Sequence, residues 1–136
     1  MIIDEESTVS RFLRAFVGWS QLQRDIVGVA LVGSHARHTA NQNSDVDLII
    51  LTLAVEKYFS SDDWLSQFGE VSDSRFEQWG RVQTLRAFYK HGLEIEYNFT
   101  NPDWASLPMD SGTQRVVKDG LKILCDPQGV LGALQG

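Results

Sequence analysis

The sequence predicts an α/β (α+β) fold in a single domain, with helices packed on a mixed β-sheet. Three observations support this prediction: an amphipathic helical pattern near the start, two apolar runs typical of buried strands, and two later segments that alternate around a glycine. The length sets a limit, because 136 residues, of which 43% are hydrophobic, can fill one core but hardly two. We therefore expect one domain over residues 1–136.

The first expected element is an amphipathic helix that begins at Ser7 or Thr8. Either hydroxyl can cap a helix, and the acidic run 4–6 before it suits the positive end of the helix dipole. Apolar side chains then recur at steps of three and four residues, namely Val9, Phe12, Leu13, Phe16 and Val17.

Two apolar runs predict the next elements. Residues 25–32 form a near-continuous apolar run rich in β-branched side chains, which is typical of a strand buried on both faces. A second strand is expected over residues 46–51, and we interpret both as parallel-type strands. Between them, Gly33-Ser34 ends the first run, residues 36–40 suit a short helical turn, and 41–44 suit a polar loop.

The remaining chain is expected to mix short helices and strands. Residues 54–68 have the pattern of a helix in pieces. Two alternating segments on either side of Gly92 predict a β-hairpin with the glycine in its turn, over residues 82–89 and 93–99. Further expected elements are a short helix at 102–104, a helix at 113–118, a strand at 121–125 and a C-terminal helix at 128–134.

Composition narrows the function. The net charge is −6 and the twelve Lys and Arg residues form no basic stripe, so long nucleic acid is not the expected ligand. Cys125 is the only cysteine, which leaves no disulfide within the chain and no Cys-based metal site. No apolar run approaches the ~20 residues needed to cross a bilayer, so we expect no membrane partner and a cytoplasmic location.

Two aspartates at the start of the second strand indicate a metal site. On a strand, residues i and i+2 point to the same face about 6.6 Å apart, so Asp45 and Asp47 present two carboxylates side by side. These like charges repel each other, and a hard divalent cation such as Mg²⁺ between them would remove the repulsion. The alternative interpretation is a strand end with two solvated aspartates.

The turn before these aspartates has features of a phosphate site. Gly33 lets the backbone approach an anion closely, and a helix that starts after it offers unpaired amide groups. Ser34 adds a hydroxyl, and Arg37 adds a fork of donors. A Gly-Ser turn alone occurs in many ordinary loops, but one followed closely by the two aspartates predicts that nucleotide phosphates bind here.

Together, Gly33-Ser34-x-Ala36-Arg37 and Ser44-Asp45-x-Asp47-Leu48 resemble the signature of the DNA polymerase beta-like nucleotidyltransferase superfamily. The similarity is to its small bacterial branch, the minimal and aminoglycoside-type nucleotidyltransferases. It implies the nucleotidyltransferase fold. It also implies transfer of a nucleoside monophosphate from a nucleoside triphosphate, with ATP as the expected donor, to a hydroxyl acceptor with release of pyrophosphate. His38 departs from the pattern, since many relatives have a second glycine there.

The family requires a third carboxylate on a neighbouring strand. Glu94 and Glu96 share one face of the expected strand at 93–99, so both are candidates. We choose Glu96, because the segment 92–96 looks like the glycine-led strand of poly(A) polymerases in this superfamily, where the later acid is the ligand. Glu94 remains the alternative, and a third interpretation is an exposed acidic strand face.

The resemblance therefore implies a complete set of site residues. Two Mg²⁺ ions would be held by three residues that are both metal ligands and catalytic, Asp45, Asp47 and Glu96. The nucleotide phosphates would be held by Gly33, Ser34 and Arg37.

The resemblance also implies partners. The acceptor would be a small molecule or a side-chain hydroxyl of a protein. Because aminoglycoside-modifying relatives carry a helical second domain, a helical partner protein or a homodimer would complete the acceptor site here. The alternative function is a catalytically silent, antitoxin-like nucleotide- or partner-binding module of the same fold.

Trp64, Trp79 and Trp104 can each stack on a base, although such aromatics more often lie in the core.

Overall fold

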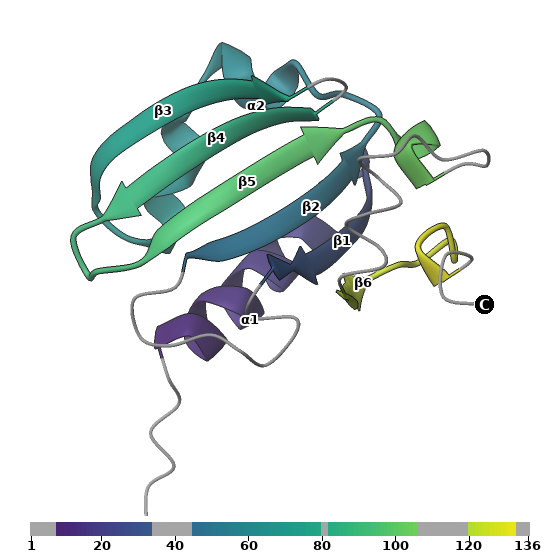
Figure 1. Ribbon diagram of the computed structural model, residues 1–136, viewed down its shortest axis with the longest axis horizontal. Helices are drawn as coiled ribbons and strands as arrows, with labels where there is room; N and C mark the ends of the chain where they lie inside the picture. Colours follow the sequence, from purple (N-terminus) through teal and green to yellow (C-terminus); the bar gives the residue numbers. More distant parts are fainter. Residues whose placement is uncertain (1–7, 34–44, 80–81, 106–119, 133–136) are drawn as a thin grey trace, which may run out of the picture.

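The computed structural model describes residues 8–33, 45–79, 82–105 and 120–132. These residues form one mixed six-stranded sheet in the order β3-β4-β5-β2-β1-β6 (Figure 1). The mixed sheet with packed helices confirms the fold class predicted from the sequence. In chain order, the elements are α1 (Thr8–Gln21), β1 (Ile26–Val32), β2 (Val46–Thr52), α2 (Lys57–Ser60), η2 (Asp63–Phe68), β3 (Val71–Trp79), β4 (Val82–Tyr89), β5 (Glu94–Thr100), η3 (Pro102–Ala105) and β6 (Leu121–Cys125).

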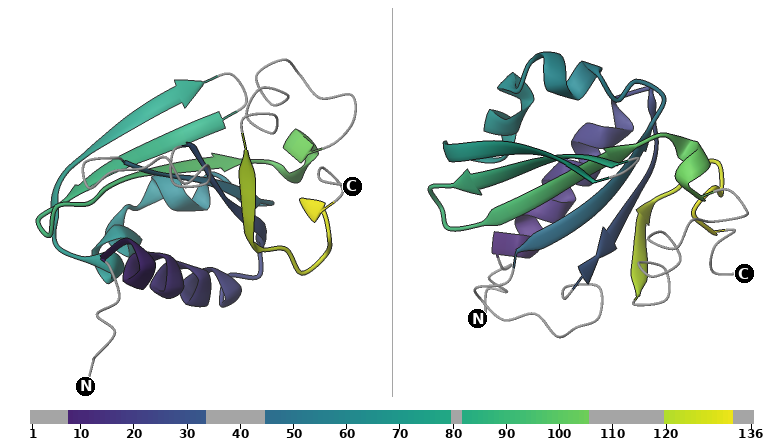
Figure 2. Two further views of the ribbon diagram at one scale, coloured as in Figure 1. Left: turned by 60° about the horizontal axis from the view of Figure 1, so that its bottom comes forward. Right: turned by 45° about the horizontal axis from the view of Figure 1, so that its top comes forward.

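The main core lies between the sheet and the helices α1, α2 and η2, which pack on one face (Figure 2). The predicted apolar stripe of α1 buries Phe12 and Phe16, whose rings contact Tyr97 on β5. Trp64 on η2 stacks on Trp19 and also contacts Tyr97. Aromatic side chains from α1, η2 and β5 therefore fix the helical layer to the centre of the sheet, and Trp64 is a core residue.

A second, smaller core covers the other face of β1 and β2. Trp104 on η3 and Leu131 near the C-terminus are both buried against apolar side chains of these two strands. Trp104 is thus also a core residue, whereas the side chain of Trp79 lies outside the described residues. With both faces covered, β1 is buried at every position, as its continuous apolar sequence predicts.

Strand direction differs from the prediction for the first two strands. β1 and β2 are antiparallel neighbours, and the parallel pair of the sheet is β2 with β5. A continuous apolar run shows that a strand is buried on both faces. Internal strands such as β1 and β2 are buried in this way whether they run parallel or antiparallel. It therefore gave no information on strand direction.

The strand β3 is absent from the prediction, because its sequence is polar and charged along most of its length. It occupies one edge of the sheet, where it pairs only with β4, and charged side chains are common on such edges. The pairing with β4, and not an apolar pattern, places these residues in the sheet.

The C-terminal segment also differs from the prediction. A helix is expected at 128–134, but residues 128–131 form turns and a bend, Gly132 is in 3-10 conformation, and residues 133–134 lie outside the described residues. Asp126 accepts hydrogen bonds from the amides of Leu131 and Gly132. Gly129, with a φ of +71°, lies in a conformation that interrupts a right-handed helix. The expected helical turn at 36–40 and the helix at 113–118 lie outside the described residues. None of the helices within the described ranges is long and apolar enough to span a membrane.

Candidate active site

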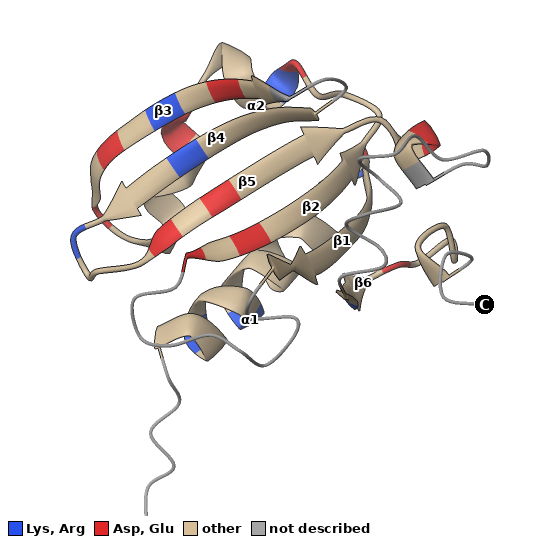
Figure 3. Ribbon diagram, in the orientation of Figure 1, with Lys and Arg blue, Asp and Glu red and all other residues tan. Residues whose placement is uncertain are grey.

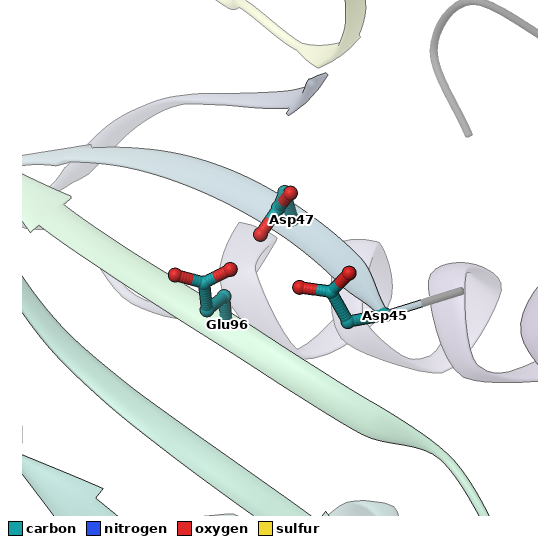
Figure 4. Close-up of side chains that lie close together, drawn as sticks. All are labelled: Asp45, Asp47 and Glu96. Carbon is teal, nitrogen blue, oxygen red and sulfur yellow. The ribbon is translucent and has the colours of Figure 1, made fainter. Parts of the chain in front are cut away.

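The two predicted aspartates and Glu96 come together on adjacent strands. Asp45 immediately precedes β2, Asp47 is its second residue, and Glu96 lies directly opposite Asp47 in the parallel pairing of β2 with β5. One carboxylate oxygen from each residue lies within 4.8 Å of those of the other two. Figure 4 shows the three side chains pointing toward one another from the two strands. Strand alternation predicted Asp45 and Asp47 on one face and left Glu94 and Glu96 as candidates; the structure brings Glu96, chosen on the family resemblance, next to the two aspartates.

Gly33 lies next to this cluster at the end of β1. Its neighbour Val32 pairs with Asp47 across β1 and β2, and Gly33 itself has a φ of +73°, which favours glycine. A Cβ atom at Gly33 would lie 2.6 Å from Oδ2 of Asp47. The backbone conformation therefore favours glycine here, and a Cβ would also force the Asp47 carboxylate to shift. Ser34 and Arg37, the other two predicted phosphate ligands, lie outside the described residues.

Arg86 on β4 is a further site residue, which the sequence analysis did not identify. Its guanidinium contacts four carboxylates, and Figure 3 shows the basic band on β4 beside the acidic bands of the neighbouring strands. The distances are 2.6 Å from Nη1 to Glu94, 3.0 Å from Nη2 to Glu96, 3.1 Å from Nε to Glu77 and 3.8 Å from Nη1 to Asp45. The predicted hairpin could have identified this residue. Positions 86 and 96 are equally far from His91 in the turn, so a regular hairpin pairs them, as the structure shows.

The two candidates for the third carboxylate occupy different positions. Glu96 belongs to the group of three carboxylates, whereas Oε2 of Glu94 accepts a hydrogen bond from Arg86. Glu94 is also more exposed than Glu96. The geometry therefore brings Glu96, and not Glu94, next to the two aspartates.

Burial and mutual repulsion make this cluster reluctant to hold three negative charges. Burial raises the pKa of Glu96, and hydrogen bonds with Asp47 and Asp45 together with repulsion from Asp47 raise it further, to about 9, although Arg86 opposes the shift. Burial also raises the pKa of Asp47, although Glu96 and Arg86 partly oppose this shift. The pKa of Arg86 is lowered by burial but raised more by Glu94, Glu96 and Glu77, so the guanidinium stays charged. Without a cation, the carboxylates retain a proton at neutral pH.

The chemistry of the cluster fits a hard divalent cation. Oδ1 of Asp47 is buried and has no hydrogen-bond partner among the described residues, although such an oxygen is costly to bury unpaired. All three ligand atoms are carboxylate oxygens, which Mg²⁺ prefers. A divalent cation would replace the retained proton and give this oxygen a partner.

Comparisons with known proteins agree with this fold. Residues 13–98 match the family model described as a nucleotidyltransferase domain, so the chain belongs to this family. The matched region contains Gly33, Asp45, Asp47 and Arg86 as well as Glu96. No curated protein is similar enough to be matched to the chain.

Solved structures show the same fold at low sequence identity. An aminoglycoside 6-adenyltransferase from Bacillus subtilis is 14% identical with a TM-score of 0.58, and the match covers 74% of this chain and 37% of that one. A CCA-adding enzyme is 19% identical with a TM-score of 0.51, over 96% and 32% of the two chains. A cytoplasmic RNA terminal U-transferase is 18% identical with a TM-score of 0.51, over 74% and 31%. The match thus spans about a third of each of these solved chains.

Proposed function

We propose that this domain transfers a nucleoside monophosphate from a nucleoside triphosphate, with ATP as the expected donor, to a hydroxyl acceptor. The observation that carries the proposal is the group formed by Asp45, Asp47 and Glu96, whose carboxylate oxygens lie within 4.8 Å of one another. This group lies inside the region matched to the nucleotidyltransferase family. Oδ1 of Asp47 is buried with no hydrogen-bond partner in the part of the chain that the structure describes, which supports a cation at the same place.

In the reaction, the acceptor oxygen forms a bond to the α-phosphorus while the bond from that phosphorus to the pyrophosphate oxygen breaks. Asp45, Asp47 and Glu96 would hold Mg²⁺, expected as two ions, which neutralises phosphate charge and lowers the pKa of the acceptor hydroxyl. Glu96 would lie near that hydroxyl and is suited to accept its proton. Gly33, Ser34 and Arg37 would bind the departing pyrophosphate.

The acceptor and its binding surface belong to this proposal as well. A small molecule or a protein side-chain hydroxyl would be the acceptor, and a helical partner protein or a second copy of the chain would complete its site. The net charge of −6 disfavours long nucleic acid as the acceptor.

Thermal unfolding tests the donor site. The wild type and Asp47→Asn are melted with each of the four ribonucleoside triphosphates, with and without Mg²⁺. We expect a magnesium-dependent rise in Tm of a few degrees with ATP, because ligand at 100 times its Kd adds ~2.7 kcal/mol. The rise should be lost in Asp47→Asn and kept in Asp73→Asn, which removes an exposed carboxylate on β3.

Two outcomes would count against transfer. No magnesium-dependent rise with any triphosphate would contradict the donor site. A rise without pyrophosphate release in the presence of hydroxyl acceptors and a helical partner would instead favour the catalytically silent binding module.

A further inference from the structure

We infer that Arg86 is the positioning residue of the site, which fixes Glu96 in the orientation needed to bind the metal. This inference rests on the proposed function, because it assigns Arg86 a task toward the cation that the three carboxylates would hold. It concerns the geometry of Glu96 and not the charge of the site as a whole.

The register of the sheet places Arg86 behind Glu96. Glu96 lies opposite Asp47 on one side and opposite Arg86 on the other, so the three side chains form a row across β2, β5 and β4. Nη2 of Arg86 contacts Oε1 of Glu96 at 3.0 Å. The guanidinium thus holds Glu96 from the side away from Asp47.

The guanidinium itself is held at three points. Nε contacts Glu77 on β3, Nη1 contacts Glu94 on β5, and Nη2 contacts Glu96, all at 3.1 Å or less. A guanidinium is a rigid plane, so contacts at three of its nitrogens determine its orientation. Glu77 and Glu94 do not belong to the group of three carboxylates, and their contacts with Arg86 give them a role in orienting it.

Burial makes these contacts more than a surface ion pair. The side chains of Arg86 and Glu96 are 22% and 17% exposed, so solvent screens their contact only in part. Groups that orient metal ligands in this way commonly change metal affinity or activity by about 10- to 100-fold when they are removed.

A simpler electrostatic explanation makes the opposite prediction. A positive charge beside a cation site repels the cation, so its removal should strengthen metal binding. The double substitution Arg86→Gln with Glu94→Gln separates the two effects, because it removes one positive and one negative charge together. If only local charge matters, this double variant should bind metal like the wild type. If Arg86 positions Glu96, binding should weaken.

The test is titration with Mn²⁺, followed by the electron paramagnetic resonance signal of the free ion, without nucleotide. We expect the Kd for Mn²⁺ to rise about 10- to 100-fold in Arg86→Gln and in the double variant. Arg75→Gln is the matched control and should bind like the wild type. Arg75 lies opposite Arg86 in the register but is 67% exposed, and its ion pair with Asp73 is long, at 3.9 Å.

Arg86→Lys provides a second test if Arg86→Gln does not fold, as judged by circular dichroism. Lysine keeps the charge, but its single ammonium lacks the planar fork that contacts Glu77, Glu94 and Glu96 within 3.1 Å, so we expect weakened binding here too. The inference is overturned if Arg86→Gln binds Mn²⁺ more tightly than the wild type, or if the double variant or Arg86→Lys binds like the wild type. Asp47→Asn separates this failure from that of the proposed function. If Asp47→Asn binds Mn²⁺ like the wild type, the metal site itself is wrong.

Discussion

At the scale of single residues, Gly33 combines a left-handed backbone with a close approach to a candidate metal ligand. An alanine here would adopt an unfavourable φ and place its Cβ 2.6 Å from Oδ2 of Asp47. We expect Gly33→Ala to lower the free energy of unfolding by about 1–3 kcal/mol, measured by urea denaturation. Gly18→Ala is the control, since Gly18 is helical with no neighbour within 4 Å and should gain up to about 1 kcal/mol. Equal stability of Gly33→Ala and the wild type would contradict the geometry at the end of β1.

The raised pKa of Glu96 has a consequence for pH. In the unfolded chain this carboxyl has a pKa near 4.5, whereas in the folded, metal-free protein its pKa is about 9. Folding therefore takes up a proton between pH 4.5 and about pH 9. Stability without metal should therefore fall as the pH rises through this window, and the raised pKa of Asp47 acts in the same direction. Chemical denaturation in EDTA at a series of pH values measures this slope.

The same proton should be released when a divalent cation binds at neutral pH. Calorimetric titration with Mg²⁺ in buffers of different ionisation enthalpy counts the protons released. We expect a smaller number in Glu96→Gln, and a pH-independent stability in EDTA for the wild type would refute this prediction. The matched control, Glu70→Gln, removes an exposed glutamate on the far side of β4 from Glu96 and should behave like the wild type.

Most residues of the candidate site follow from sequence because strand alternation and motif spacing are local. Asp45 and Asp47 could be selected in this way, and alternation reduced the third carboxylate to Glu94 or Glu96. The family resemblance favoured Glu96, which the structure brings next to the two aspartates. Arg86 could not be selected from alternation alone, because its importance comes from pairing across two strands. The hairpin register does pair residue 86 with residue 96. Nothing else in the sequence distinguishes Arg86 from the other scattered basic residues.

At the scale of elements, Asp25 connects the second helix to the sheet. Its carboxylate accepts hydrogen bonds from Thr52 at the end of β2, from Lys57 and from Tyr58 on α2. Burial raises the pKa of Asp25, but hydrogen bonds from these three side chains lower it more, so it ends below its ordinary value of 3.8. A carboxylate with a lowered pKa stabilises the fold above its unfolded pKa and loses this contribution as the pH falls.

We therefore predict that Asp25→Asn is less stable than the wild type at neutral pH, and that the difference shrinks below pH 3.8. Urea denaturation at a series of pH values measures the difference. Asp73→Asn, an exposed carboxylate on β3, should show no such change. A difference for Asp25→Asn that stays constant with pH would contradict the role of its charge.

The attachment of α1 depends on its aromatic side chains. Phe16 is fully buried and its ring contacts Trp19, Phe68 and Tyr97. We expect Phe16→Ala to cost about 3–5 kcal/mol, measured by chemical denaturation. Leu22→Ala, at a position that is 79% exposed just after the helix, should have little effect. Similar losses in both variants would mean that α1 does not pack as described.

Element prediction succeeded where an apolar pattern reports burial, and it failed for the edge strand β3 and for strand direction. The stripe of α1, the buried strands and the hairpin all have apolar patterns that report burial. β3 has charged residues at an edge, and the direction of β1 relative to β2 depends on sheet topology. Neither is determined by local hydrophobicity.

At the scale of the whole molecule, the two faces of the sheet differ in what they carry. The aromatic core anchors one face to the helices, while the other face carries the second core over β1 and β2 and the charged row of Asp47, Glu96 and Arg86 across β2, β5 and β4. A rigid sheet with a buried core behind it is a suitable support for side chains that must hold a cation in fixed geometry. We therefore propose that Asp45, Asp47 and Glu96 hold a divalent cation on this support.

Crystals grown with Mn²⁺ and a non-hydrolysable ATP analogue test this claim most directly, through the anomalous signal of the metal. We predict an anomalous peak about 2.2 Å from carboxylate oxygens of Asp45, Asp47 and Glu96, next to the triphosphate. The peak should disappear in Asp47→Asn. A nucleotide bound without metal at these residues, or a peak at another place in the chain, would contradict the account.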